Sequence, residues 1–446
     1  IPLSEAVPVL ENFGLKVIEE YPFDLAEGRL GWIHDFIAET PDAGDRDLAH
    51  LEGRLESALA DVLSGTREND GFNALILACN LAAEDASLLR AWFRYLRQTG
   101  VTYGVMTVVD ALKRYPVLTR TLVALFSARF GPGVFDRSVA QADLLARIDL
   151  GLEDVTSIDD DRIIRLYRAA ILATLRTNFF VPGGPEAMAF KIDSAAMPGL
   201  PSPIPYREIW VFSPRVEGIH LRSGPIARGG LRWSDRRDDF RTEVLGLVKA
   251  QKVKNTVIVP TGAKGGFYPK QLPPMANRDA WLAEGTEAYR VFIRALLSIT
   301  DNLASDGTVL PPAGVVCHDA PDPYLVVAAD KGTATFSDTA NGIAENHGFW
   351  LGDAFASGGG NGYDHKAMGI TAKGGWISVQ RHFREMDIDV QTQTVRVAGV
   401  GDMSGDVFGN GMLLSPVIAL VAAFDHRHIF LDPAPMVAAA FAERQR

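Results

Sequence analysis

The spacing of hydrophobic residues changes along the 446-residue chain, and this change constrains the fold more than any other feature. Residues 1–45 alternate short apolar and polar runs, which is typical of a pair of strands. From residue 47 to about residue 177, apolar residues recur at every third or fourth position in six runs, which predicts helices. Beyond residue 179, short β-branched and aromatic runs alternate with helical ones. We therefore expect a helical region followed by a layered α/β part.

The alternation beyond residue 179 predicts individual elements. Three strands are expected in MAFKIDS, REIWVFS and EGIHLRS, which Pro and Gly residues bound. A Gly-rich segment at residues 357–362 is typical of a functional loop or hinge. Helices are expected at residues 240–253, 278–304, 337–347 and 371–384, and further strands at residues 255–260, 325–329, 394–400 and 418–424.

Composition narrows the classes of function. The 44 Lys and Arg residues face 55 Asp and Glu residues, a formal net charge of −11, whereas proteins that bind nucleic acid usually carry a basic face. The longest apolar run, near residues 416–424, is shorter than the roughly 18 residues that a membrane-spanning helix needs. Two cysteines, Cys79 and Cys317, fit a reducing compartment. We therefore expect a cytoplasmic protein with no nucleic acid and no membrane among its partners.

The segment at residues 224–270 concentrates groups that are suited to chemistry. Its first part, GPIARGGLR, places Arg228 beside Gly229 and Gly230. Glycines allow a backbone to approach a ligand closely, and a guanidinium matches the geometry of a carboxylate or phosphate. The same residues also fit a tight surface turn whose arginines pair with the aspartates of the following SDRRDD. The sequence leaves both interpretations open.

A lysine between glycines follows in the motif TGAKGG. It comes directly after the strand predicted in NTVIVP, so we expect Lys264 in a loop at the carboxyl end of that strand, where open α/β sheets bind ligands. A phosphate-binding P-loop requires Ser or Thr after the lysine, and here a glycine follows it. Lys264 is therefore a candidate proton carrier. Lys249, Lys252 and Lys254 precede it, either as a cationic cluster or as the solvated face of a helix.

Asp330 closes the apolar run LVVAAD. A carboxylate at the end of this strand is expected to point toward the same crevice as Lys264. An aspartate in this position can equally be the N-cap of the next helix, so the residue by itself does not decide between the two roles.

A dinucleotide-binding pattern occurs near the end of the chain. The strand TVRVAG leads into Gly399-Val-Gly401-Asp-Met-Ser404, followed by a short helical segment, a second strand and Asp425. This order is typical of a Rossmann unit, in which the acid accepts hydrogen bonds from the ribose hydroxyls and favours NAD over NADP. Ser404 stands where the third glycine is usual, and Arg427 leaves NADP open.

Histidines give no support for a metal site. His426 and His428 form an HxH pair, and His318 precedes Asp319, but no further ligand follows at a spacing typical of zinc. We expect no bound metal.

Taken together, these motifs resemble a known family. GPIARGGLRWSDR, PTGAKGGFYPK, DPYLVVAADKGTATFSD, GYDHKAMGITAKGGWISVQ and GVGDMSGDVFGNGMLLS are similar to segments of the large-subunit, NAD-specific bacterial glutamate dehydrogenases. The likeness extends upstream through the helical region, so it covers nearly the whole chain. The combined motifs are long and far more specific than an isolated GxG.

The resemblance implies a role for each matching residue. Lys264 corresponds to the lysine that activates water, and Asp330 to the aspartate that exchanges protons with the amino group. Lys252 corresponds to the lysine that holds the α-carboxylate, while Arg228 stands where smaller members carry a lysine for the side-chain carboxylate. Thr371 corresponds to a threonine facing the nicotinamide. The remaining implied contacts are Gly229 and Gly230 with the substrate, and Gly399, Gly401, Ser404 and Asp425 with the dinucleotide.

The resemblance also implies the reaction, which is the reversible, NAD-dependent deamination of L-glutamate to 2-oxoglutarate and ammonium, in a homo-oligomer. Glutamate carries two carboxylates, so two separate cations are needed to orient it. Two alternatives stay open at this stage. One is an amino-acid dehydrogenase with an apolar substrate, and the other is a non-catalytic module that binds nucleotide or mediates assembly.

The expected fold class is α/β. Residues 1–45 would end a regulatory or linker segment, residues 46–178 form a helical region, residues 179–385 a substrate-binding domain of the glutamate dehydrogenase type, and residues 386–446 the first part of a Rossmann NAD-binding domain. Only 47 residues follow Gly399, whereas a complete six-stranded domain built from βαβ units of roughly 30 residues needs more. With Ile1 in place of Met, the sequence predicts a truncated piece that is inactive alone.

Overall fold

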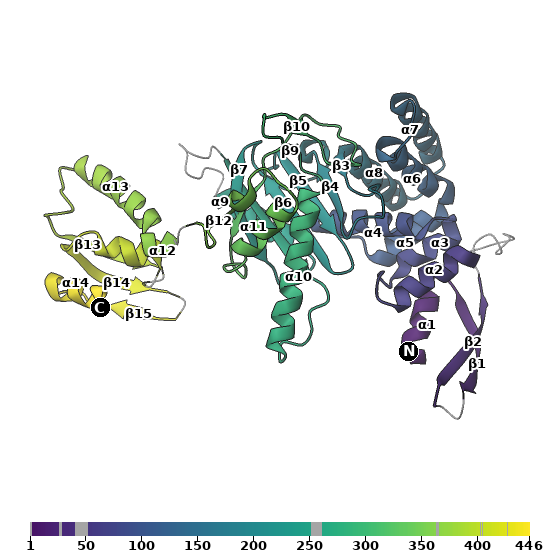
Figure 1. The fold of residues 1–446 in the computed structure, drawn as a ribbon, viewed down its shortest axis with the longest axis horizontal. Coiled ribbons are helices and arrows are strands. Elements are labelled where there is room, and N and C mark those ends of the chain that lie inside the picture. The colour runs from purple at the N-terminus through teal and green to yellow at the C-terminus, as the bar shows by residue number, and fades with distance from the viewer. Residues whose placement is uncertain are drawn as a thin grey trace. The chain divides into compact units, whose positions relative to one another are not determined.

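The computed structural model describes residues 2–25, 29–40, 52–250, 261–362, 365–401, 403, 405–425 and 427–446. Two compact units make up the chain, Ile1–Ser357 and Gly358–Arg446, and each is described by itself. Figure 1 shows that the first unit combines a helical region with a large sheet, while the second is a small α/β layer. Within the described ranges, no helix has the length and apolar character that crossing a bilayer would require.

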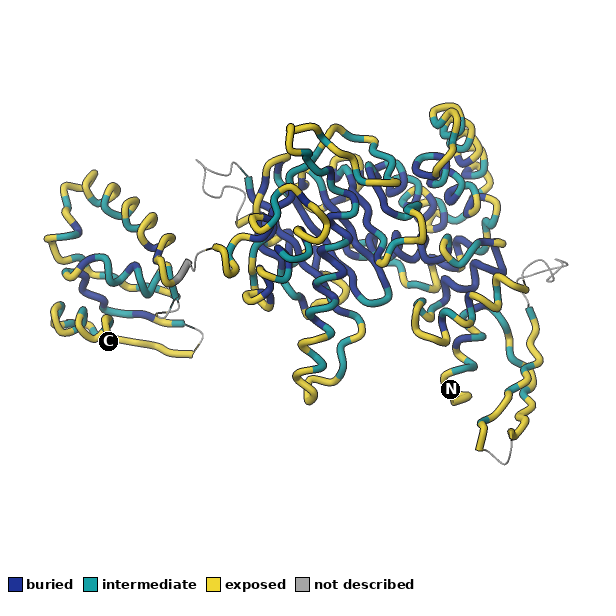
Figure 2. The backbone as a smooth tube through the Cα atoms, viewed as in Figure 1, coloured by how far each residue is buried: buried dark blue, intermediate teal, exposed yellow. Residues whose placement is uncertain are grey.

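The first unit begins with a helix and a two-stranded ribbon. α1 (Leu3–Asn12) precedes the antiparallel strands β1 (Lys16–Leu25) and β2 (Gly31–Glu39). The sequence predicted the two strands but not α1. Val9 and Phe13 of this segment pack with Ala58 and Val62 of the next helix, whereas most of the ribbon is exposed (Figure 2).

The helical region has the helices that the three- and four-residue spacing predicts, and one more. Pro116 occupies the first turn of its helix, where its missing N–H costs nothing. The missed helix is α7 (Arg137–Glu153); it buries only Ile148 and Leu152, so its apolar periodicity is weak. The helices are α2 (Glu52–Leu63), α3 (Ala74–Cys79), α4 (Ala83–Gln98), α5 (Val105–Arg114), α6 (Pro116–Phe130), α7 and α8 (Ile158–Ala173).

The last helix of this region is shorter than its sequence pattern suggests. The periodic run extends to about residue 179, but α8 ends at Ala173 and the chain continues as strand β3 (Thr174–Thr177). Thr174 and Thr177 pair with Ile192 and Phe190 of β4. Pairing with a neighbouring strand has therefore overridden the local helical pattern.

A mixed eight-stranded sheet follows in the order β12-β11-β7-β8-β6-β5-β4-β3. Four neighbouring strands, from β12 to β8, run parallel to one another, and the others pair in antiparallel fashion. The strands predicted in MAFKIDS, REIWVFS and EGIHLRS are confirmed. Their bounds are β4 (Met188–Ile192), β5 (Arg207–Phe212), β6 (Val216–Arg222), β7 (Ala227–Trp233), β8 (Thr261–Pro269), β11 (Val326–Ala329) and β12 (Ala356–Ser357).

Helices cover both faces of this sheet. On one face, Trp210 stacks on Phe240 of α9 (Phe240–Ala250) and contacts Tyr95 of α4. On the other face, Phe267 packs against Phe292 of α10 (Arg278–Leu297), with α11 (Ser337–Asn346) beside it. The dark core in Figure 2 is this double packing, which holds the sheet rigid between two apolar layers. The helix expected at residues 278–304 ends at Leu297, before the short strand β9 (Asn302–Leu303), which pairs with β10 (Val309–Leu310).

The second unit is built on two parallel strands. β13 (Val395–Val400) lies beside β14 (Ile418–Phe424), and β15 (Ile429–Leu431) adds an antiparallel edge. Trp376 of α13 (Ile370–Arg384) packs with β14, so this helix belongs to the second unit, whereas the sequence placed it at the end of the substrate-binding domain. The remaining helices are α12 (His365–Met368) and α14 (Val437–Gln445), with turns of helix at Asp406–Asn410 and Gly411–Leu413.

Candidate active site

The two glycine-rich motifs of the first unit form strands, not loops. GPIARGGLRW supplies β7, and TGAKGG opens β8, so Lys264 is the fourth residue of a strand in the middle of the sheet. The expectation that Lys264 lies in a loop after a strand is therefore wrong. The strand predicted at residues 255–260 lies outside the described residues.

Close packing between strands explains the glycines. A Cβ added at Gly229 would lie 1.3 Å from the carbonyl oxygen of Ala263, and one at Gly230 would lie 2.5 Å from that of Ala329. On β8, a Cβ at Gly265 would meet the Leu231 side chain at 2.4 Å. Gly229 and Gly230 therefore bring three backbones together, and the surface turn suggested as an alternative is not observed.

Lys264 and Asp330 form an ion pair at the junction of these strands. The Lys264 ammonium donates a very short hydrogen bond to Asp330 Oδ2, although the two residues are 66 positions apart. Lys264 is only 6% exposed, and the Asp330 side chain is mostly buried. Asp330 follows β11, and the N-cap of the next helix is Phe336. Asp330 is therefore not the N-cap of that helix.

Arg232 connects this pair to helix α9. Its guanidinium lies 3.2 Å from Asp330 Oδ1 and 2.9 Å from Glu243 Oε1, while the Ser234 hydroxyl donates to the other oxygen of Glu243 at 2.7 Å. Burial opposes ionisation of Asp330, but the Lys264 ammonium, the Lys331 N–H and Arg232 outweigh it and lower the Asp330 pKa. Asp330 is therefore ionised and lies between two cations.

Arg228 is the exposed residue of strand β7. Its Nε donates to the Tyr324 hydroxyl at 2.6 Å. Lys252, the other cation expected to bind substrate, lies outside the described residues, as does Lys254. The structure thus brings Lys264, Asp330 and the Arg228-Gly-Gly segment to one place.

A buried ionic network fixes the loop that leads to β11. Lys191 pairs with Asp319 at 2.5 Å and with Asp322 at 2.6 Å, and Arg222 binds the same Asp322. Although burial disfavours its charge, Arg222 and Lys191 lower the pKa of Asp322 to about 2. Because removing one partner would leave a buried charge uncompensated, this network holds the loop firmly against the sheet.

The predicted dinucleotide residues gather in the second unit. Gly401 follows β13, Asp425 follows the parallel β14, and the Gly401 N–H donates to the Phe424 carbonyl at 3.0 Å. Gly401 has φ +154°, and a Cβ at Gly399 would meet the Phe408 ring at 2.2 Å. Glycine is therefore needed at both positions, as the close turn of a dinucleotide-binding unit requires.

The other predicted cofactor contacts lie nearby or outside the described residues. The Thr371 N–H, at the start of α13, donates to Asp406 at 3.1 Å, just beyond the glycine turn. Asp425 accepts the N–H groups of Arg427 and His428, both at 2.7 Å, and these hydrogen bonds lower its pKa. Ser404 is not among the described residues. An ionised acid and a glycine turn at the ends of two parallel strands fit the ribose and pyrophosphate of NAD.

Two residues with contacts at the site, Arg232 and Tyr324, were not selected from the sequence. Arg232 was part of the GGLR motif, but nothing local showed that its partners would be Asp330 and Glu243. Tyr324 was one of many aromatics. The register of β7 between β8 and β11, together with the position of α9, creates these contacts, and such long-range pairings carry no local signal.

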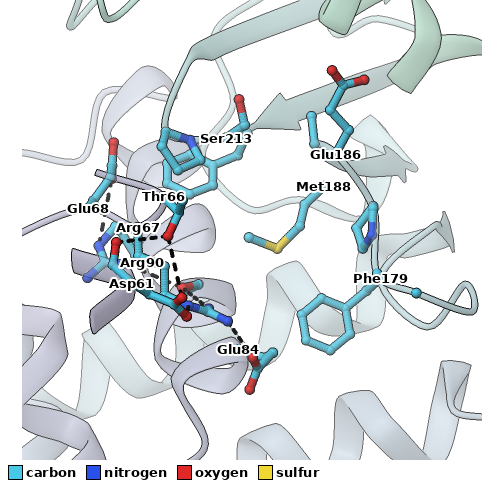
Figure 3. A pocket seen from close by; sticks show the side chains of 17 residues that line it. Asp61, Thr66, Arg67, Glu68, Glu84, Arg90, Phe179, Glu186, Met188 and Ser213 are labelled. Atoms are coloured by element: carbon cyan, nitrogen blue, oxygen red, sulfur yellow. Dashed lines mark hydrogen bonds and ion pairs between the residues drawn. The ribbon is translucent and has the colours of Figure 1, made fainter. Parts of the chain in front are cut away.

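A separate cavity of about 490 Å³ lies between the helical region and the turn joining β5 to β6 (Figure 3). Arg67 in its wall donates to Asp61 at 2.7 Å and also pairs with Glu84, while Phe179 and Met188 form an apolar side. None of the residues predicted from the sequence lines it. Among the described residues, no cluster of three or more His, Cys, Asp or Glu side chains could hold a metal ion.

Comparison with known proteins identifies a family for most of the chain. The family model described as bacterial NAD-glutamate dehydrogenase, catalytic domain, matches residues 147–446. Two others, glutamate dehydrogenase helical motif 3 and glutamate dehydrogenase ACT3 domain, match residues 67–132 and 1–51.

Curated relatives match over the full length of the chain. It is 55% identical to the NAD-specific glutamate dehydrogenase of Pseudomonas aeruginosa and 51% identical to that of Mycobacterium tuberculosis. The chain spans 28% of the former protein and 29% of the latter. The solved glutamate dehydrogenase of Peptoniphilus asaccharolyticus overlaps 73% of this chain and 66% of its own, at 14% identity and a TM-score of 0.34, which is too loose a match to support a conclusion.

Proposed function

The chain belongs to the bacterial NAD-glutamate dehydrogenase family, and from this premise we propose that it carries the catalytic site of an enzyme that oxidises L-glutamate with NAD⁺. Because the chain spans less than a third of its curated relatives, the activity is proposed for the whole protein. The observation that carries the proposal is the buried Lys264–Asp330 pair, with Arg232 behind it.

The proposed reaction converts L-glutamate, NAD⁺ and water into 2-oxoglutarate, ammonium, NADH and a proton. Asp330, ionised by its cationic neighbours, takes a proton from the substrate amino group while the hydride leaves the α-carbon. Lys264 then orients and activates the water that adds to the resulting imine. When bound, NAD⁺ supplies the hydride acceptor. General acid–base groups placed in this way typically contribute 10²–10⁴-fold to a rate, on the order of 3–5 kcal/mol.

Substrate orientation requires two further cations. We assign the α-carboxylate to Lys252 and the side-chain carboxylate to Arg228. The exposed position of Arg228 beside Gly229 and Gly230 supports the assignment of the side-chain carboxylate to Arg228. Gly229 and Gly230 contribute by allowing the β7 backbone to approach its neighbours and the substrate.

Cofactor binding is assigned to the second unit. Gly399, Gly401 and Ser404 would surround the pyrophosphate, Asp425 would accept from the ribose hydroxyls, and Thr371 would face the nicotinamide. The strand–turn–strand geometry with the ionised Asp425 supports NAD. We propose a division into residues 1–45, 46–178, 179–357 and 358–446, with the last boundary moved to the limit between the two compact units because α13 packs in the second one. We also propose a cytoplasmic homo-oligomer. The cytoplasm is favoured because Cys79 and Cys317 form no disulfide.

NADH formation by the purified full-length protein tests the proposal. We expect a higher kcat/KM for L-glutamate than for L-leucine or L-valine, because an apolar side chain leaves Arg228 without an anionic partner. A preference for leucine or valine would contradict the assignment of Arg228. Calorimetric binding of NAD⁺ without any glutamate-dependent NADH formation would instead support a non-catalytic module.

A further inference from the structure

Tyr324 is the residue through which the buried ionic network reaches the proposed substrate cation. Its hydroxyl accepts a hydrogen bond from Arg228 Nε at 2.6 Å. Arg228 is on β7, whereas Tyr324 precedes β11, so the contact joins segments that are 96 positions apart in the sequence.

The backbone of Tyr324 is held firmly in place. Its carbonyl oxygen accepts from Arg222 at 2.8 Å, and the same guanidinium binds Asp322, two residues earlier. The Trp350 indole donates to the adjacent Pro323 carbonyl at 2.8 Å. Arg222 is 3% exposed, so these anchors are part of the buried network described above. The backbone that carries the phenol is therefore fixed near Arg228 of β7.

The identity of the bonded nitrogen matters for recognition. A guanidinium has five donors in one plane, and its two terminal nitrogens form a fork that matches a carboxylate. The Tyr324 hydroxyl accepts from Nε, which is not one of the two terminal nitrogens. In the described part of the chain, the terminal nitrogens of Arg228 have no protein partner. The hydrogen bond therefore fixes the plane of the guanidinium while leaving its fork available to a ligand.

We propose that Tyr324 is a positioning residue that determines substrate specificity by presenting the Arg228 fork to the side-chain carboxylate of glutamate. This inference rests on the proposed function. An arginine on a flexible stem loses rotamer entropy when it binds a carboxylate, and a prior hydrogen bond to a phenol on an anchored backbone removes part of that cost before the substrate arrives.

The test uses the full-length protein with Tyr324→Phe, which removes only the hydroxyl. L-glutamate is compared with L-norvaline, which has a terminal methyl group in place of the side-chain carboxylate. We expect the KM for glutamate to rise about tenfold, as the loss of one charge-assisted hydrogen bond implies, with a smaller change in kcat. The kcat/KM for norvaline should stay within about twofold of wild type, because this substrate makes no use of the fork.

Two further variants separate positioning from general damage. In an Arg228→Ala background, Tyr324→Phe should not change the glutamate-to-norvaline ratio further, since the two residues act through one contact. Tyr103→Phe is the matched control, because it removes a hydroxyl that donates to Asp159 at 2.8 Å in the helical region, and it should leave the ratio unchanged.

The outcomes distinguish this inference from the proposed function. If the wild-type protein oxidises glutamate and Tyr324→Phe lowers kcat/KM equally for both substrates, or for neither, the inference is overturned and the proposed function stands. If wild type shows no glutamate-dependent NADH formation, both are overturned. A selective loss with glutamate that disappears in the Arg228→Ala background supports the inference.

Discussion

The two candidate sites of this chain are held together in different ways. In the first unit, Lys264 is paired with Asp330, 66 positions away, within an eight-stranded sheet covered on both faces. In the second unit, Asp425 is held by the N–H groups of residues two and three positions later, beside a three-stranded sheet. Contacts between distant segments form the first pair, whereas the acid of the second site is held by hydrogen bonds from its immediate neighbours in the chain.

This difference predicts which amino-acid substitutions each site tolerates. The Lys264–Asp330 pair depends on strand register, because β7 lies directly between β8 and β11, so a change in any of these strands should disturb it. The cofactor turn depends on a few adjacent residues. Substitutions there should alter binding without unfolding the surrounding structure.

The largest expected effect is on kcat, and it separates the chemical step from cofactor binding. Lys264→Ala in the full-length protein should lower kcat by about 10²–10⁴-fold, since it removes the proposed general acid–base group, while the affinity for NAD⁺ measured by calorimetry stays the same. Lys249→Ala, on the exposed face of α9, is the control and should keep its turnover. Near-wild-type turnover of Lys264→Ala would refute the catalytic assignment.

The next effect is on the free energy of unfolding. It tests whether close packing of the strands in register determines the stability of the first unit. Gly229→Ala would place a Cβ against the backbone carbonyl of Ala263, so separating the strands should cost about 2–4 kcal/mol. Gly246→Ala, in α9 with open space around it, should instead stabilise by up to about 1 kcal/mol. Denaturant unfolding of the full-length variants measures both changes. Equal stability of the two variants would mean that β7 and β8 are not packed this closely.

A smaller effect is expected from the cofactor turn. Asp425→Ala should raise the KM for NAD⁺ about tenfold, by the loss of a charged acceptor for the ribose, with little change in the unfolding midpoint. Asp432→Ala, a partly exposed acid in the same unit, is the control. A large loss of stability in Asp425→Ala would show that the turn is not locally independent.

The smallest effect is a shift in pH dependence. Arg232 is one of the groups that lower the Asp330 pKa, so Arg232→Met should raise that pKa. Because we propose that Asp330 acts as an ionised base, the acid limb of kcat/KM should move to higher pH, since one of the cations that favour its charged form is lost. Arg236→Met, which breaks an exposed pair with Asp239, should leave the profile in place. A shift to lower pH would contradict the role given to Arg232.

Local sequence patterns predicted much of the fold. The helices at Ser337–Asn346 and Ile370–Arg384 and the strands at Val326–Ala329 and Ile418–Phe424 lie within one residue of the expected bounds. α11 and β14 bury much of their apolar surface, which gives a strong local pattern, whereas α13 buries only Ala372. The glycine-rich strands β7 and β8 were misassigned, since glycine ordinarily indicates a turn, and only the closeness of neighbouring strands makes it necessary here.

The sequence by itself determined the alternation of elements and the family resemblance, and through that resemblance it made Lys264 and Asp330 candidates for proton transfer. It also indicated the glycine turn and Asp425, because each follows a strand with a clear local pattern, although the pairing of β13 with β14 brings the two together. Tertiary structure alone decided that Arg232 joins Asp330 to Glu243 and that Tyr324 holds Arg228. Those contacts form because the strand register brings distant segments together. The spacing of residues along the chain does not specify that register.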